Sequence, residues 1–179
     1  MNQALLVVDV QPAYGRHCES IARQVAQRIN NTRRPVLIFW VGEGLTEDTQ
    51  YDVYEFLRAA GAYRPKLDQA AFVEKDYGFY RPWMDCGMPE ETIVSVGRAM
   101  RQRGISDSRM VDLVEILGEE PSTPIPMGPM VEPSFADDRL QMFDHFQTCG
   151  GGREECLAEM ELFLQIHDKS YTRLEHLVY

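Results

Sequence analysis

Cys156 is the residue of this sequence that is best placed for nucleophilic chemistry. It follows three consecutive glycines, at residues 150–152, and stands in the first turn of a segment with the apolar spacing of a helix. The unpaired N–H groups at the start of a helix carry partial positive charge, which favours a thiolate and can hold a developing oxyanion. The stretch therefore predicts a reactive cysteine, with a buried structural cysteine after a glycine loop as the alternative.

Asp9 and Lys75 each end an apolar run of strand length. Residues 4–8 are aliphatic throughout, as in a strand covered on both faces of a parallel sheet, and residues 70–75 form a similar run. Ligands bind beyond the carboxyl ends of such strands in open α/β sheets. A lysine placed between a carboxylate and a thiolate would stabilise both charges and help to move a proton. The alternatives are that Asp9 caps a turn and that Lys75 is a solvated loop residue.

The order of apolar runs and helical stripes predicts one doubly wound, Rossmann-like α/β domain over residues 1–179. Strands are expected at residues 4–8, 35–41, 70–75, 140–146 and 170–174, and helices at residues 16–30, 51–60, 89–103, 105–117 and 153–166. Strand–helix–strand units of this length form right-handed crossovers, so we predict a parallel sheet flanked by helices. A chain of 179 residues that is 44% hydrophobic can bury one sizeable core.

A proline-rich insertion interrupts this pattern at residues 121–133. It holds five of the ten prolines of the chain, together with Ile125, Met127, Met130 and Val131. So many prolines exclude a helix or an inner strand. We expect an extended segment, either a lid over the site or an arm that reaches a partner subunit. The arm would make the protein a homo-oligomer.

The charge and the cysteines exclude several classes of protein. The formal net charge is −10 and the basic residues are scattered, so nucleic acid is not an expected partner. Neither the cysteines nor the histidines have metal-site spacing, and we expect no metal and no cofactor. The cysteines are Cys18, Cys86, Cys149 and Cys156, and the histidines are His17, His145, His167 and His176. No signal peptide or membrane-length apolar run is visible, so we expect a reduced, soluble, cytoplasmic protein that does not bind membranes.

Three segments resemble the isochorismatase-like cysteine hydrolases, the superfamily of nicotinamidases and N-carbamoyl amide hydrolases. They are Leu-Leu-Val-Val-Asp-Val-Gln at residues 5–11, Lys-Asp-Tyr-Gly-Phe at residues 75–79, and residues 150–156, where the family has a glycine and a cysteine six positions apart. The resemblance implies that Asp9, Lys75 and Cys156 form the catalytic triad. It also implies attack of the cysteine on a carbonyl carbon and a thioester that water resolves.

The resemblance implies further site residues. Backbone N–H groups of Gly152 and Cys156 would form the oxyanion hole, beside a cis peptide at residues 151–152. The residues expected to bind the small-molecule substrate are Gln11, Tyr14, Phe79, Trp83 and Arg153, with ordinary core as the equal alternative for the aromatic residues after Lys75. The predicted activity is therefore metal-independent hydrolysis of a small amide or carbamoyl C–N bond.

The chain also departs from the family pattern. Gly151, Gly152 and Arg153 stand where relatives have an alanine or small β-branched residue and a threonine, and the chain stops soon after its final predicted strand. We therefore expect a smaller sheet, or one completed by a partner. Two alternative functions stay open: an inactive protein that binds a ligand, and a vinyl-ether hydrolase that needs the aspartate but not the thiol. Cys149 is a rival nucleophile, ranked lower because it precedes the glycines.

Overall fold

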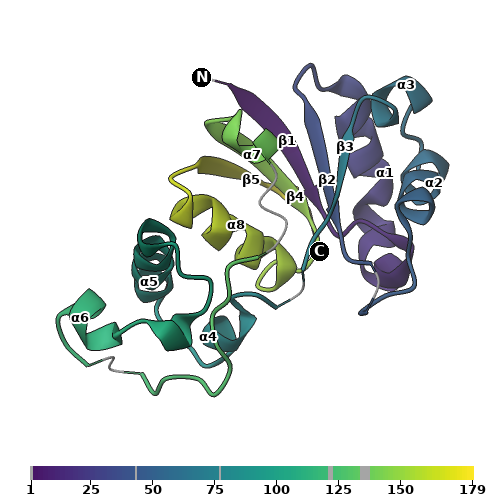
Figure 1. The fold of residues 1–179 in the computed structure, drawn as a ribbon. Helices are drawn as coiled ribbons and strands as arrows, with labels where there is room; N and C mark the ends of the chain where they lie inside the picture. Colours follow the sequence, from purple (N-terminus) through teal and green to yellow (C-terminus); the bar gives the residue numbers. More distant parts are fainter. Residues whose placement is uncertain (1, 43, 77, 121–122, 134–137) are drawn as a thin grey trace.

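The protein folds around a parallel β-sheet. The computed structural model describes residues 2–42, 44–76, 78–120, 123–133 and 138–179. Within these residues the sheet has five strands in the order β3-β2-β1-β4-β5, and every neighbouring pair is parallel (Figure 1). The strands are β1 (Gln3–Val8), β2 (Val36–Trp40), β3 (Ala71–Glu74), β4 (His145–Gly150) and β5 (Ser170–Val178). The predicted doubly wound α/β class is confirmed.

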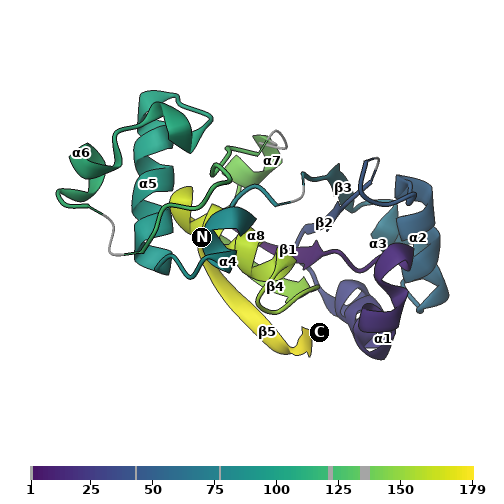
Figure 2. The same ribbon diagram turned by 90° about the horizontal axis from the view of Figure 1, so that it is seen from below.

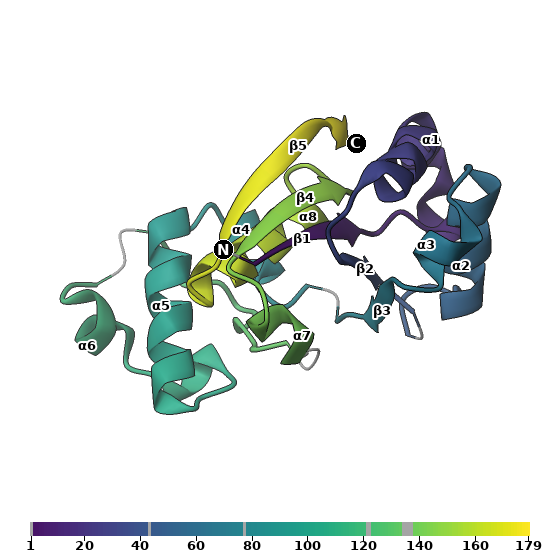
Figure 3. The ribbon, with the colours of Figure 1, turned by 90° about the horizontal axis from the view of Figure 1, so that it is seen from above.

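Helices cover both faces of the sheet, as Figures 2 and 3 show. Alternate residues of β1 point to opposite faces. Leu5 and Val7 share a core cluster with α1 (Gly15–Asn31) and α2 (Gln50–Ala59), whereas Leu6 and Val8 share one with α8 (Cys156–Ile166) and with α5 (Glu90–Arg103), which packs against α8. Complete burial of each such side chain contributes about 1.5–3 kcal/mol. None of the helices described crosses a bilayer, because each is too short or too polar.

The shorter helices connect these layers. They are η1 (Pro12–Tyr14), α3 (Arg64–Leu67), α4 (Arg81–Asp85), η2 (Ser108–Met110), α6 (Leu113–Leu117) and α7 (Asp138–Gln141). The single helix predicted at residues 105–117 is wrong, since the chain forms η2 and α6 instead. The side chain of Asp107 accepts the N–H of Arg109, and that of Asp112 accepts the N–H groups of Val114 and Glu115. Each aspartate begins a new short helix.

The last two strands differ from their predicted bounds. Residues 138–141 form α7, so β4 begins at His145 and pairs with β1 as far as Gly150. β5 extends to Val178 rather than ending at residue 174. β4 ends in threonine, cysteine and glycine, so its sequence lacks the apolar run that predicts a strand. Its neighbours β1 and β5 flank it on both sides in the sheet.

The proline-rich insertion folds back on its own chain. Pro121, at its start, lies outside the described residues, as does residue 122. Met130 is fully buried, Ser108 N donates to Met130 O at 2.9 Å, and Val131 N donates to Phe79 O at 2.9 Å. Residues 123–133 do not line the cavity at Cys156, so the lid expectation is wrong for them. The arm to a partner subunit stays a prediction.

Candidate active site

A buried ion pair spans β2 at the carboxyl end of the sheet. Asp9 follows β1 with φ of +53°, and its N–H donates to Phe39 O at 2.9 Å. Lys75 follows β3, and its backbone N–H donates to Trp40 O at 2.8 Å. These bonds hold both residues to β2, and Lys75 Nζ lies 3.1 Å from Asp9 Oδ2 with neither side chain exposed.

Cys156 joins this pair from the other side of β1. It is the first residue of α8, only 8% of it is exposed, and its thiol lies close enough to the Asp9 carboxyl group for each to shift the pKa of the other. Among the described residues neither Asp9 oxygen has a partner with the geometry of a hydrogen bond, so its close polar contact is the ion pair with Lys75. The structure therefore brings together the three side chains that the sequence singled out, here called the Asp9–Lys75–Cys156 cluster.

The protonation of the cluster follows from its burial. Burial raises the pKa of Cys156 to about 12, and the neighbouring Asp9 charge adds to this effect more than Lys75 offsets it. Burial also raises the pKa of Asp9, against the opposing effects of the Lys75 charge and of the nearby Cys156 thiol. For Lys75, burial lowers the pKa, but the charges of Asp9 and Cys156 outweigh it and the pKa is raised.

The pKa shifts of Lys75 and Cys156 correspond to an ammonium and a neutral thiol beside the Asp9 carboxyl group. The thiolate expected at the helix start is not favoured, because burial and then the charge of Asp9 raise the pKa of Cys156. A carboxylate with a raised pKa is correspondingly a better base for the thiol proton.

The glycines before Cys156 are required by two close approaches. Gly150 has φ of +110°, and a Cβ there would lie 2.1 Å from Val8 O. A Cβ on Gly151 would lie 2.2 Å from Tyr179 Oη. The turn thus follows the β1 backbone too closely for a side chain at residue 150, and the Tyr179 side chain fills the space at residue 151. The expected cis peptide at residues 151–152 is wrong, because every described peptide bond is trans.

An open cavity of about 650 Å³ lies above the thiol. We call it the Cys156 cavity, and its walls include Tyr14, His17, Thr46, Gly152, Arg153 and Tyr179. Tyr14 and Arg153 therefore lie where substrate contacts were predicted. The Arg153 guanidinium already pairs with the Glu175 carboxylate on β5 and donates to Glu175 O at 3.3 Å.

Gln11, Phe79 and Trp83 do not line the Cys156 cavity. Gln11 is buried, and its Nε2 donates to Val41 O and to Asp48 Oδ2, both at 2.8 Å, so it holds the loop after β2. Phe79 and Trp83 belong to the core under α5 and α8. The expectation that these aromatic side chains wall the substrate pocket is wrong, because the chain after Lys75 turns toward α8 and buries them there.

Cys149 is not placed to act as the nucleophile. It is fully buried on the α1 face of the sheet, opposite to the face that carries Cys156. Burial raises its pKa to about 12, and that of Cys18 to about 11. Cys86 is exposed and outside the cluster.

Two residues near the cluster were missed in the sequence. Tyr179 Oη donates to Asp9 O at 3.1 Å, and its ring stacks on His17 at 6.1 Å. The carboxylate of Glu159, one turn after Cys156, accepts the N–H groups of Tyr80 at 2.6 Å and Arg81 at 2.8 Å. An acid inside the apolar run of a helix is a usable signal for Glu159, but nothing near Tyr179 in the sequence marks its contact with Asp9.

Two solved structures match this chain at low sequence identity. MAR1 ribonuclease from Caenorhabditis elegans has 11% identity and a TM-score of 0.48, over 99% of this chain and 64% of that chain. N-carbamoylsarcosine amidase from Thermoplasma acidophilum has 13% identity and a TM-score of 0.45, over 99% of this chain and 84% of that chain. This chain thus spans less than two thirds of the ribonuclease chain. At such values neither likeness assigns a family or an activity. A scan against protein-family models and a search of curated proteins give no match.

Proposed function

We propose that this protein is a cysteine hydrolase that cleaves a C–N bond in a small amide or carbamoyl compound. The observation that carries the proposal is the contact of one buried carboxylate, Asp9, with both the Lys75 ammonium and the Cys156 thiol. A nucleophile, its base and a charge partner are thereby assembled below an open cavity.

In the first step Asp9 accepts the thiol proton as Cys156 Sγ attacks the carbonyl carbon. The carbonyl oxygen becomes an oxyanion, for which we propose the backbone N–H groups of Gly152 and Cys156 as donors. The C–N bond then breaks, the nitrogen takes the proton from Asp9, and the acyl group stays on sulfur as a thioester.

Water completes the cycle. Asp9, again a carboxylate, takes a proton from a water molecule that attacks the thioester carbon. The C–S bond breaks, and the sulfur recovers the proton from Asp9. Lys75 remains charged throughout and offsets the negative charge that passes between Asp9 and the sulfur.

The test starts from a Cys86→Ser variant, because exposed Cys86 would otherwise consume the reagent. We expect iodoacetamide to modify Cys156 faster than Cys18 or Cys149, as read by intact mass and peptide mapping. A panel of nicotinamide, N-carbamoyl amino acids and simple amides should include a substrate whose acyl group adds to Cys156 and is released by hydroxylamine. Cys156→Ala should abolish both the adduct and turnover.

Two results would overturn the proposal. One is hydrolysis that persists unchanged in Cys156→Ala. The other is equal, slow alkylation of all three buried thiols with no acyl adduct from any compound, which would leave a ligand-binding protein.

A further inference from the structure

Four cations gather at the amino ends of the parallel strands, opposite to the end of the sheet that carries the candidate active site. They are Arg28 in the last turn of α1, Arg33 and Arg34 just before β2, and Lys66 on α3, which Figure 1 shows beside the start of β2. Within the described residues none of the four forms an ion pair, whereas arginines such as Arg81 and Arg173 are held by carboxylates.

Three of these cations line one cavity of about 280 Å³, which we call the β2-start cavity. They are Arg33, Arg34 and Lys66, and the other described walls are Pro35, Val36, Gln69 and Ala70. No acidic side chain is among these described walls. The cavity therefore has a net positive wall on a chain whose formal net charge is −10.

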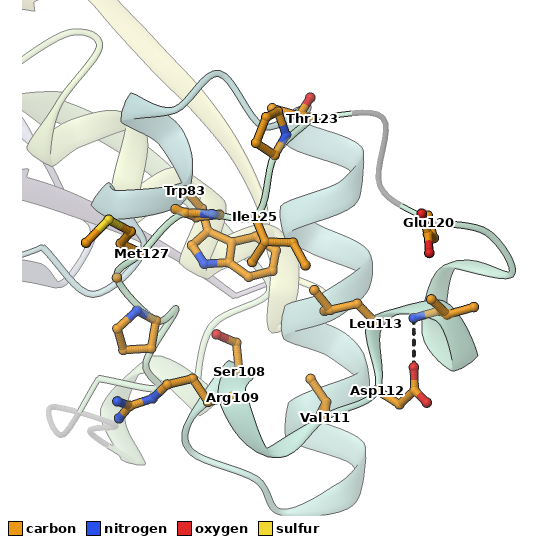
Figure 4. A pocket seen from close by; sticks show the side chains of 15 residues that line it. Trp83, Ser108, Arg109, Val111, Asp112, Leu113, Glu120, Thr123, Ile125 and Met127 are labelled. Carbon is orange, nitrogen blue, oxygen red and sulfur yellow. Dashed lines mark hydrogen bonds between the residues drawn. The ribbon is translucent and has the colours of Figure 1, made fainter.

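Other cavities of the protein have mixed charges. The cavity of about 660 Å³ in Figure 4 is lined by Arg109 together with Asp112 and Glu120, and Arg109 Nε lies 3.0 Å from Asp107 Oδ1. The Cys156 cavity also has a carboxylate in its wall, that of Glu155. The β2-start cavity differs from both, because its described walls offer positive charge alone.

Two of the guanidinium groups share one neutral acceptor. The side-chain oxygen of Gln147 accepts from Arg28 Nη2 and, at 3.0 Å, from Arg34 Nη1. Arg34 Nε donates to the equally neutral Gln3 Oε1 at 2.9 Å. An amide oxygen satisfies N–H groups but does not cancel charge, so the fold holds two positive charges side by side without compensation.

The cavity also keeps hydrogen-bond donors that a ligand can reach. Arg33 is exposed, and its side chain has no hydrogen bond to a described residue. Arg34 is half-buried and leaves Nη2 unused within the same part of the chain. Lys66 Nζ donates one bond, to Thr32 O at 2.7 Å, although an ammonium group has three protons to donate.

The end of α1 accounts for only part of this charge. A helix carries about half a negative charge at its carboxyl end, and α1 ends at Asn31. The bond from Lys66 to Thr32 O, the residue after α1, already offsets that partial charge. The three arginines are therefore in excess of what the helix end requires.

We propose that the β2-start cavity binds a small anion that carries a phosphate group. A phosphate group has close to two negative charges at neutral pH, and its oxygens match the paired N–H groups of guanidinium. A single carboxylate would leave most of the positive charge unmatched. The volume lies at the lower limit of small-molecule sites, roughly 300 Å³, which suits a phosphate with few further atoms.

The test is isothermal titration calorimetry with inorganic phosphate, phenyl phosphate and acetate at one ionic strength. We expect both phosphates to saturate one site per chain and acetate to bind at least tenfold more weakly. Equal affinities of the two phosphates would identify free phosphate as a sufficient ligand. Tighter binding of phenyl phosphate would identify an organic phosphate.

A matched pair of variants separates the cavity from the net charge of the protein. Arg33→Gln removes one unpaired charge from the cavity and should weaken phosphate binding about tenfold. Arg23→Gln removes the same charge from an exposed position of α1 outside the described cavity walls and should leave binding unchanged. Circular dichroism checks that both variants keep the fold.

The proposal is overturned if neither phosphate gives saturable heat, or if Arg33→Gln and Arg23→Gln weaken binding equally. Loss of phosphate binding in Arg153→Gln would also overturn it, because the anion would then lie in the Cys156 cavity. A labelled single-stranded oligonucleotide that needs Arg33 and is not displaced by phosphate would assign the surface to nucleic acid instead.

Discussion

Lys75 Nζ lies 3.1 Å from Asp9 Oδ2 across strand β2, with no exposure of either side chain. Removing one member leaves the other charged and without its counter-ion in the core. We expect Lys75→Met to lower the free energy of unfolding by about 3–5 kcal/mol, measured by urea denaturation. The double variant Asp9→Asn/Lys75→Met should recover most of this loss, because it removes both charges.

The exposed pair of Arg58 and Glu55 on α2 is the control for that experiment. Arg58→Ala should change the free energy of unfolding by less than about 1 kcal/mol, since water screens the pair. A Lys75→Met effect as small as the Arg58→Ala effect would show that the buried charges are not coupled as described.

Asp9→Asn should make the Cys156 thiol easier to ionise and at the same time slow hydrolysis. The charge of Asp9 raises the pKa of Cys156, whereas that of Lys75 lowers it, so the asparagine variant removes the larger unfavourable charge and keeps the favourable one. In the wild type, burial raises the pKa of Cys156 to about 12. In Asp9→Asn we expect the iodoacetamide rate to rise with pH at a lower midpoint than in the wild type. Hydrolysis, which needs Asp9 as the base, should fall by at least about a hundredfold.

Lys75→Met should move the same alkylation profile in the opposite direction. Both variants are measured in the Cys86→Ser background, so that one modified thiol is followed. An Asp9→Asn profile displaced to higher pH would mean that Asp9 does not act on the thiol through its charge.

Turnover should have an acid limb that belongs to Asp9. Burial raises the pKa of this carboxyl above its ordinary 3.8, and the proposed base works only when it is deprotonated. kcat/KM should therefore fall as the pH is lowered through a midpoint above 3.8. Because burial also raises the pKa of Glu159, the profile must be repeated in Glu159→Gln. The limb should persist there, and its loss would assign it to Glu159.

Much of the site could be predicted from the sequence, because strand ends and a helix start fix where Asp9, Lys75 and Cys156 lie. The ionisation of Cys156 could not, since its pKa is raised first by burial and then by the Asp9 charge, and the depth of burial does not follow from the sequence. The sequence could not decide between pocket wall and core for the aromatic residues after Lys75, for a related reason. Composition does not distinguish a pocket wall from a core, and the contacts of Phe79 and Trp83 with the α5–α8 layer decide it.

The two close approaches of the glycine turn should respond differently to a second substitution. A Cβ on Gly150 would meet the backbone oxygen of Val8, whereas a Cβ on Gly151 would meet the Tyr179 side chain. We expect Gly150→Ala and Gly151→Ala each to destabilise the fold by about 2 kcal/mol or more. Tyr179→Ala should rescue only Gly151→Ala, as read by thermal unfolding. Equal rescue of both would show that the turn shifts as a unit.

Glu159 is proposed as a positioning residue that joins α8 to the chain after Lys75. Its carboxylate accepts the N–H groups of Tyr80 and Arg81, and a glutamine oxygen can accept the same bonds. Glu159→Gln should therefore keep the fold, whereas Glu159→Ala should lose about 2 kcal/mol because two buried donors lose their acceptor. The carboxylate also raises the pKa of Cys156, so Glu159→Gln should shift the alkylation profile toward lower pH. A glutamine variant as unstable as the alanine variant, with an unshifted profile, would make the charge of Glu159 purely structural.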